Sequence, residues 1–236
     1  MSQISEAIYR DAVEEIHKVE PISSSKSALV ISLSDYETGD PSNWKPFMMP
    51  RELCETDERY LQIIPYVHLV NEHGEYFSYE RGGAGNEARL HAKRSIGLGG
   101  HIDNPVTTTL DELIAVEAAR ELEEEVGLVV NTQKMLDALK HAIIIRETST
   151  AVDRVHLGIA FGVSVHSSEL KKLEQGVIIN PLWLSPRMIY MHWMLKDLVK
   201  SDMLKWEFEI WSQIVLQVAL ETPAVTTEPE TLNAFL

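Results

Sequence analysis

Acidic residues are concentrated in one stretch of the sequence, from Asp103 to Glu125. This stretch holds eight carboxylates and one arginine, a net charge of −7, within a 236-residue chain whose total is −15. Clustered carboxylates are the ligands that Mg²⁺ uses together with substrate phosphates. A solvated acidic helix face has the same composition, so the stretch indicates either a divalent-metal site or a plain acidic surface.

A helix must position these carboxylates. Thr109 followed by Glu112 fits a capping box and Gly127 fits a C-terminal stop, which predicts one helix over 110–126. At 100° per residue, an apolar face separates from an acidic one. The apolar face comprises Ala115, Ala118, Ala119, Leu122 and Val126, and the opposite side carries Glu117, Glu121, Glu124 and Glu125.

The acidic face is electrostatically unfavourable without a partner. Like charges at i,i+4, as in Glu117/Glu121 and Glu121/Glu125, each cost roughly 0.2–0.5 kcal/mol. Anions near a helix C-terminus cost roughly a further 0.3–1 kcal/mol each. A bound divalent cation would turn this repulsion into ligation.

The segment from Glu112 to Leu128 closely resembles the Nudix signature, G-x5-E-x7-R-E-U-x-E-E-x-G-U, in which U is bulky and aliphatic. The chain reads Glu112, seven residues, then RELEEEVGL, and every specified position matches. The loop before the helix differs, because eleven residues instead of five separate Gly100 from Glu112. Two further stretches, RLHAKRSIGLGGHID and DRVHLG, look like a bacterial MutT-like branch of predicted phosphoesterases.

The resemblance implies roles for particular residues. Glu121, Glu124 and Glu125 would ligate Mg²⁺ or Mn²⁺, and the Gly100 carbonyl would add a ligand. Arg120 and Glu112 would orient the ligand face as part of the catalytic set. Glu112 also has a simpler interpretation, as the third helical residue of the capping box.

The chemistry that such a site supports is hydrolysis of a diphosphate. Metal ions neutralise the phosphate oxygens and lower the pKa of a bound water, and a general base then removes the proton. The base is a signature glutamate or an acid from another loop, and the sequence leaves this open. The outside candidates are Glu147, Asp153, Glu169 and Glu174.

A basic stretch just before Gly100 is a candidate for phosphate capture, since arginine makes bidentate contacts with phosphate. A solvated loop that offsets nearby acid is the alternative. The predicted substrate-binding residues are Arg81, Arg89, Arg94, His101 and Arg154.

Composition narrows the class of protein. The net charge of −15 is unfavourable for duplex nucleic acid, and no apolar run is long enough for a membrane span. The single cysteine and the absence of a secretory signal pattern predict a cytoplasmic location. The apolar helices predicted near 187–199 and 203–220 could form core or a homodimer contact.

The predicted organisation is an N-terminal extension over 1–55, a Nudix domain over 56–222 and a flexible tail over 223–236. A strand is predicted at 28–33, a hairpin at 61–70 and 75–81, and further strands at 142–145, 155–165 and 177–184. These elements favour an α/β (α+β) class, and the resemblance implies a Nudix-type α/β/α sandwich with a mixed β-sheet.

The predicted function is a Mg²⁺- or Mn²⁺-dependent pyrophosphohydrolase that cleaves a phosphoanhydride bond in a nucleoside-diphosphate-linked or related nucleotide, a small-molecule substrate. Two alternatives stay open: a non-catalytic module that senses a nucleotide through the same fold, and a protein whose acidic helix is only structural.

Overall fold

The computed structural model describes residues 26–83, 93–103, 109–195 and 206–221. They fall into two compact units. The first contains residues 26–63, 101–103 and 147–157, and the second contains residues 64–100, 109–146, 158–195 and 206–221 within those described ranges. The first 25 residues of the predicted N-terminal extension lie outside the described ranges.

The first unit is built on short antiparallel strands. Its elements are β1 (Ser27–Ser32), α2 (Leu33–Tyr36), η1 (Pro41–Asn43), β2 (Phe47–Pro50), α3 (Arg51–Cys54), the start of β3 (Tyr60–Val70) and η3 (Asp153–Val155). β1 pairs with β2 and with β3, in the registers Ala28↔Met49 and Ile31↔Leu61. Part of the proposed N-terminal extension is therefore folded, and its predicted strand is confirmed as β1.

The second unit has strands between two layers of helices. Its strands are the rest of β3, β4 (Tyr76–Arg81), β5 (Arg94–Ser95), β6 (Gly97–Leu98), β7 (Ile143–Ile145), most of β8 (His156–Ser164) and β9 (Ile178–Leu184). β4 pairs antiparallel with β3, β5 and β9, and β6 pairs with β3. β7 pairs with β8, which also pairs with β3.

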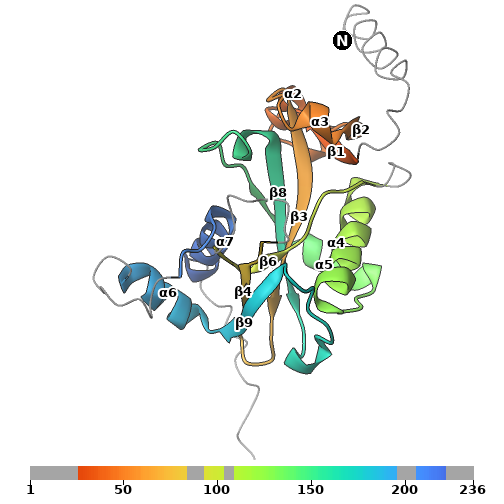
Figure 1. Cartoon of the computed structure of the whole chain (residues 1–236). Helices are drawn as coiled ribbons and strands as arrows, with labels where there is room; N and C mark the ends of the chain where they lie inside the picture. The colour runs from red at the N-terminus through yellow and green to blue at the C-terminus, as the bar shows by residue number, and fades with distance from the viewer. Residues whose placement is uncertain (1–25, 84–92, 104–108, 196–205, 222–236) are drawn as a thin grey trace, which may run out of the picture. The chain divides into compact units, whose positions relative to one another are not determined.

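The helices of the second unit are α4 (Leu110–Val126), α5 (Thr132–Leu139), α6 (Pro186–Leu195) and α7 (Ile210–Glu221), with the short turn η4 (Ser167–Glu169). α4 and α5 lie on one side of the strands and α7 on the other (Figure 1). One core cluster fills the α7 side and includes Tyr76, Ile145, Phe208 and Leu216. The predicted mixed-sheet α/β/α arrangement is confirmed.

The acidic helix has the predicted bounds and caps. Thr109 Oγ1 accepts a hydrogen bond from the Glu112 N–H at 3.3 Å, and a Glu112 carboxylate oxygen accepts one from the Thr109 N–H at 3.2 Å. Gly127 ends the helix with φ +65°, a left-handed conformation that favours glycine. Within the described residues, no helix is long and apolar enough to cross a membrane.

One expectation about a helix was wrong. In the described part of the region predicted as a helix over 203–220, the helix begins only at Ile210, because Phe208 forms a parallel bridge with Arg94 instead. The acidic side of α4 is partly buried. Glu117 and Glu125 are 1% and 8% exposed, because α4 buries more than half of its circumference.

Candidate metal centre

Three carboxylates of α4 are drawn together by Arg120. Its Nε donates to Glu117 at 2.8 Å, its Nη2 to Glu121 at 2.6 Å and its Nη1 to Glu124 at 2.9 Å. Burial alone would lower the pKa of Arg120, but these carboxylates outweigh it and raise that pKa above its ordinary value. Arg120 thus holds three glutamates of α4 side by side, and its role in orienting metal ligands stays a prediction.

Glu125 is the most deeply buried of the three expected metal ligands. One of its carboxylate oxygens, Oε2, has no hydrogen-bond partner among the described residues. Burial raises the pKa of Glu125 to about 8, the charges of Glu121 and Glu174 act in the same direction, and Arg81 opposes them. A buried carboxylate oxygen without a partner is costly, so a cation at this position would relieve that cost.

The Gly99–Gly100 turn packs against two of these carboxylates. The Gly99 N–H donates a hydrogen bond to the Glu125 carboxylate. A methyl group on Gly100 would lie 2.5 Å from Glu121 Oε1, so only glycine fits beside that carboxylate as it stands. Burial also raises the pKa of Glu121, although Arg120 opposes this. The structure therefore places Gly100 against Glu121, and the role of its carbonyl as a metal ligand stays a prediction.

The donor set fits Mg²⁺ or Mn²⁺. Both are hard ions that prefer oxygen ligands, and α4 offers carboxylate oxygens of which one is buried and unpaired. The Arg120 guanidinium balances the negative charges of Glu121 and Glu124. Within the described ranges, no three His, Cys, Asp or Glu side chains already converge on a common point as a metal site would.

Two of the five predicted substrate-binding residues, Arg81 and Arg94, make buried contacts within the protein. Arg94 is 1% exposed, and its guanidinium donates to Ser78 Oγ at 3.2 Å and to the Asn180 carbonyl at 2.9 Å. It also lies over the Trp206 ring, 4.7 Å from the centroid. These contacts hold β4, β9 and the segment before α7 together, so the structure gives Arg94 a structural role.

The remaining predicted substrate-binding residues are Arg154, His101 and Arg89. Arg154 makes an exposed ion pair with Glu58 at 2.6 Å in the first unit. His101, in the same unit, has its Nε2 3.3 Å from that of His156, and burial lowers the pKa of His101 to about 3. Arg89 lies outside the described residues. Substrate binding by these three residues stays a prediction.

Two of the four candidate bases belong to the first unit and two to the second. Glu147 and Asp153 belong to the first unit, where both bind neighbouring loop groups. Glu169 accepts a hydrogen bond from the His166 N–H at 2.6 Å. Glu174 is half-buried, and its N–H donates to the Glu125 carbonyl at 2.8 Å, which places it beside the acidic helix.

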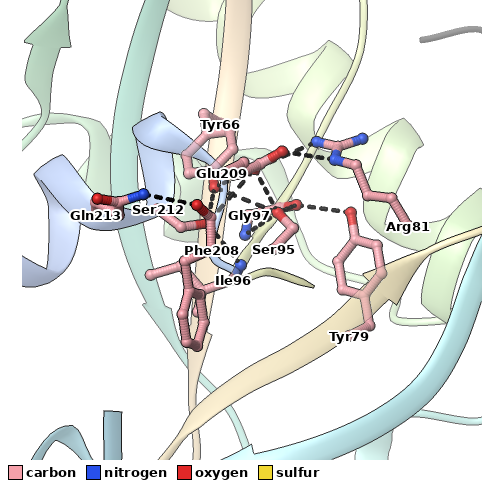
Figure 2. Close-up of polar contacts among 10 residues, drawn as sticks. All are labelled: Tyr66, Tyr79, Arg81, Ser95, Ile96, Gly97, Phe208, Glu209, Ser212 and Gln213. Carbon is pink, nitrogen blue, oxygen red and sulfur yellow. Dashed lines mark hydrogen bonds and ion pairs between the residues drawn. The ribbon is translucent and has the colours of Figure 1, made fainter. Parts of the chain in front are cut away.

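Sequence reasoning missed a buried polar network centred on Glu209, which immediately precedes α7. Glu209 accepts hydrogen bonds from Arg81 Nε at 2.7 Å, from Ser95 Oγ at 2.6 Å and from the Tyr66 hydroxyl at 2.7 Å (Figure 2). Burial alone would raise the pKa of Glu209, but Arg81 and these hydrogen bonds hold it below its ordinary value. The only signal in the sequence is an acid inside the aromatic stretch WEFEIW.

A groove lies beside the C-terminal end of α4. The N–H groups of Lys171 and Lys172 both point to the Val126 carbonyl, at 3.2 and 3.4 Å. The groove has a volume of about 270 Å³, and its wall includes both lysines together with Phe77, Trp183 and Leu182. Phe77 and Trp183 pack edge to face with ring centroids 5.4 Å apart.

Comparison with known structures defines the fold class. Tm1382, described as a candidate Nudix hydrolase, aligns with a TM-score of 0.60 and 20% identity over 83% of this chain and 98% of its own. A Nudix hydrolase from Alicyclobacillus acidocaldarius aligns with a TM-score of 0.47 and 13% identity, over 69% of this chain and 92% of its own. The fold is therefore that of the Nudix superfamily.

Sequence comparison identifies the family. Protein YmaB of Bacillus subtilis is 31% identical over 175 residues, which are 72% of this chain and 76% of YmaB. This chain belongs to the same family as YmaB. No protein-family model matches the sequence.

Proposed function

We propose that this chain is a divalent-metal-dependent pyrophosphohydrolase that cleaves a phosphoanhydride bond in a nucleoside-diphosphate-linked or related nucleotide. The observation that carries the proposal is the carboxylate pair of α4 formed by the half-buried Glu121 and the buried Glu125. Glu121 packs against Gly100, and Glu125 keeps a buried oxygen without a hydrogen-bond partner among the described residues. Such an arrangement is costly as bare structure and useful as a cation site.

When bound, Mg²⁺ or Mn²⁺ would neutralise phosphate oxygens and lower the pKa of a water molecule. Glu121, Glu124 and Glu125 would hold the ion with the Gly100 carbonyl. Arg120 would keep the carboxylates aligned from the side, because it also binds the buried Glu117.

Glu174 is the candidate base that the geometry favours. It is the one of the four acids whose main chain is hydrogen bonded to the acidic helix, at the Glu125 carbonyl. Its charge also contributes to the raised pKa of Glu125. We therefore assign to Glu174 the removal of the proton from the attacking water.

The groove beside α4 supports a nucleotide-like substrate. Lys171 and Lys172 supply positive charge in an acidic protein, and the edge-to-face pair of Phe77 and Trp183 supplies an apolar wall. An anionic molecule that carries a flat ring matches both features. The cytoplasmic location and the homodimer stay predictions.

A substrate screen tests the proposal. Purified protein with Mg²⁺ or Mn²⁺ should release phosphate or a nucleoside monophosphate from a member of a diphosphate panel, with products identified by mass spectrometry. Glu124→Gln should lower kcat at least about a hundredfold, because it removes an anionic ligand. Glu123→Gln is the matched control, since Glu123 is exposed and matches no ligand position.

Two results would contradict the proposal. Activity that survives Glu124→Gln would show that the ligand assignment is wrong. Tight nucleotide binding without turnover at any metal concentration would favour the sensing module instead.

A further inference from the structure

Glu117 is the most deeply buried carboxylate of α4. It is 1% exposed, against 8% for Glu125. Burial of a charged carboxylate is costly unless the group is paired, and Glu117 accepts a hydrogen bond from Arg120 Nε at 2.8 Å. Glu117 matches no specified position of the Nudix signature, so the resemblance gives no reason for an acid at this buried position.

The Arg120 guanidinium offers each of its three nitrogens to a different carboxylate. Nε binds Glu117, Nη2 binds Glu121 at 2.6 Å and Nη1 binds Glu124 at 2.9 Å. The group is rigid and planar, so a contact that fixes Nε also fixes the directions of both Nη groups. The pair with Glu117 is the least screened by solvent, because the side chain of Glu117 is 1% exposed and those of Glu121 and Glu124 are 15% and 58% exposed.

Charge balance separates Glu117 from the two expected metal ligands that Arg120 also contacts. Glu121 and Glu124 can pair with Arg120 or with a divalent cation, because both partners are positive. When these two carboxylates turn to a cation, Glu117 still balances the charge of Arg120. Without Glu117, the guanidinium would keep one of the two carboxylates, since its positive charge would otherwise stand unpaired beside a metal ion.

We propose that Glu117 is a positioning residue for the metal centre: it is the counter-ion that holds Arg120 in place while Glu121 and Glu124 bind a divalent cation. The inference rests on the proposed function, because it takes these two glutamates as ligands. It also accounts for an acid that is buried on the same helix as the ligands and is bound to the arginine that contacts them.

Glu112, to which the resemblance assigns an orienting role, has a different task in the structure. Its carboxylate accepts a hydrogen bond from the Thr109 N–H at 3.2 Å, which completes the capping box. Glu112 also precedes Arg120 by roughly 12 Å along the helix axis, at about 1.5 Å per residue. Glu117 lies three positions before Arg120 and contacts it directly, so the geometry favours Glu117 as its partner.

The test measures the Mn²⁺ affinity of the full chain from the electron paramagnetic resonance signal of free Mn²⁺. Glu117→Gln keeps the size of the side chain and removes its charge. We expect its Kd to rise at least about tenfold, because residues that orient metal ligands typically contribute ten- to a hundredfold to affinity. Glu117→Asp keeps the charge on a shorter side chain, so its Kd should lie between those of wild type and Glu117→Gln.

Two comparisons separate positioning from a general loss of negative charge. Glu123→Gln removes a charge from an exposed position of the same helix and should change Kd by less than about threefold. In an Arg120→Met background the residue through which Glu117 acts is absent. Adding Glu117→Gln there should therefore also change Kd by less than about threefold.

Urea unfolding of the metal-free variants shows whether each one folds. If Glu117→Gln does not fold, Glu117→Asp takes its place, and a Kd equal to that of wild type would then overturn the inference. A folded Glu117→Gln with lower stability and a Kd no higher than that of Glu123→Gln would overturn it as well, because Glu117 would then serve only the fold.

The remaining outcomes separate this inference from the proposed function. Wild-type protein that binds no Mn²⁺ would overturn both. A rise in Kd that persists in the Arg120→Met background would overturn the inference alone, because Glu117 would then act on the cation without the arginine. A raised Kd in Glu112→Gln but not in Glu117→Gln would also overturn it and return the orienting role to Glu112.

Discussion

Gly100→Ala should weaken metal binding while it leaves the fold nearly intact. The added methyl carbon would lie 2.5 Å from Glu121 Oε1, against an ordinary contact of at least 3.4 Å. The carboxylate must therefore move by about 0.9 Å, the difference between these two distances. Ligand oxygens bind Mg²⁺ at nearly fixed distances, so such a displacement disturbs the coordination geometry.

The expected losses of stability and of metal affinity in Gly100→Ala follow from the other contacts of Glu121. Its Oε1 binds Arg120 at 2.6 Å, and loss of this partly exposed ion pair should cost less than about 1 kcal/mol of unfolding free energy. The backbone of Gly100 has no positive φ, so alanine adds no backbone strain. Metal affinity should fall about ten- to a hundredfold, or roughly 1.4–2.8 kcal/mol.

The assay pairs Mn²⁺ titration with urea unfolding of the metal-free protein. Gly83→Ala is the control, because a methyl group there would meet nothing within 4 Å. An unchanged Mn²⁺ affinity in Gly100→Ala would refute the assignment of Glu121 as a ligand in this geometry. A loss of several kcal/mol in the free energy of unfolding would show instead that the Glu121 carboxylate cannot move away from the added methyl group.

Three further predictions concern the base, the helix cap and the effect of pH. Glu174→Gln should lower kcat at least about a hundredfold with little effect on Mn²⁺ affinity; equal losses in both would place Glu174 among the ligands instead. Thr109→Ala removes the capping hydrogen bond of α4 and should reduce the unfolding free energy by about 1 kcal/mol in urea denaturation, whereas no change would mean that the cap does not stabilise the helix. Burial lowers the pKa of His68 to about 4, below the ordinary 6.5. Between these two pH values the unfolded chain binds more protons than the folded chain. The free energy of unfolding should therefore fall by up to about 3 kcal/mol as pH drops from 6.5 to 4. His68→Phe should flatten that part of the pH profile, and an equally steep profile in the variant would assign the loss to other groups.

The acidic helix was predictable because its determinants are local. Thr109 and Glu112 fix the start of the helix through hydrogen bonds within its first turn, and Gly127 ends the helix with a left-handed backbone conformation. These residue types stand at fixed spacing, so the sequence alone reveals them. The β3–β4 hairpin was predictable for the same reason, since a turn sequence separates two apolar runs.

Other features depend on contacts that spacing does not encode. Arg94 resembles a phosphate-binding residue in the sequence, yet tertiary packing buries it against Ser78, Asn180 and Trp206. Glu209 pairs with Arg81 across 128 positions of sequence, so its importance becomes visible only in the folded chain. α5 was not predicted, although Asn131 caps it through a hydrogen bond to the Lys134 N–H.

The position of a bound metal ion tests the central claim most directly. Crystals grown with Mn²⁺ should give an anomalous scattering peak within roughly 2.0–2.3 Å of carboxylate oxygens from Glu121, Glu124 and Glu125, with the Gly100 carbonyl completing the protein ligands. Strong anomalous density elsewhere, with Glu121 and Glu124 still bound to Arg120 and no ion beside the three glutamates, would contradict the account.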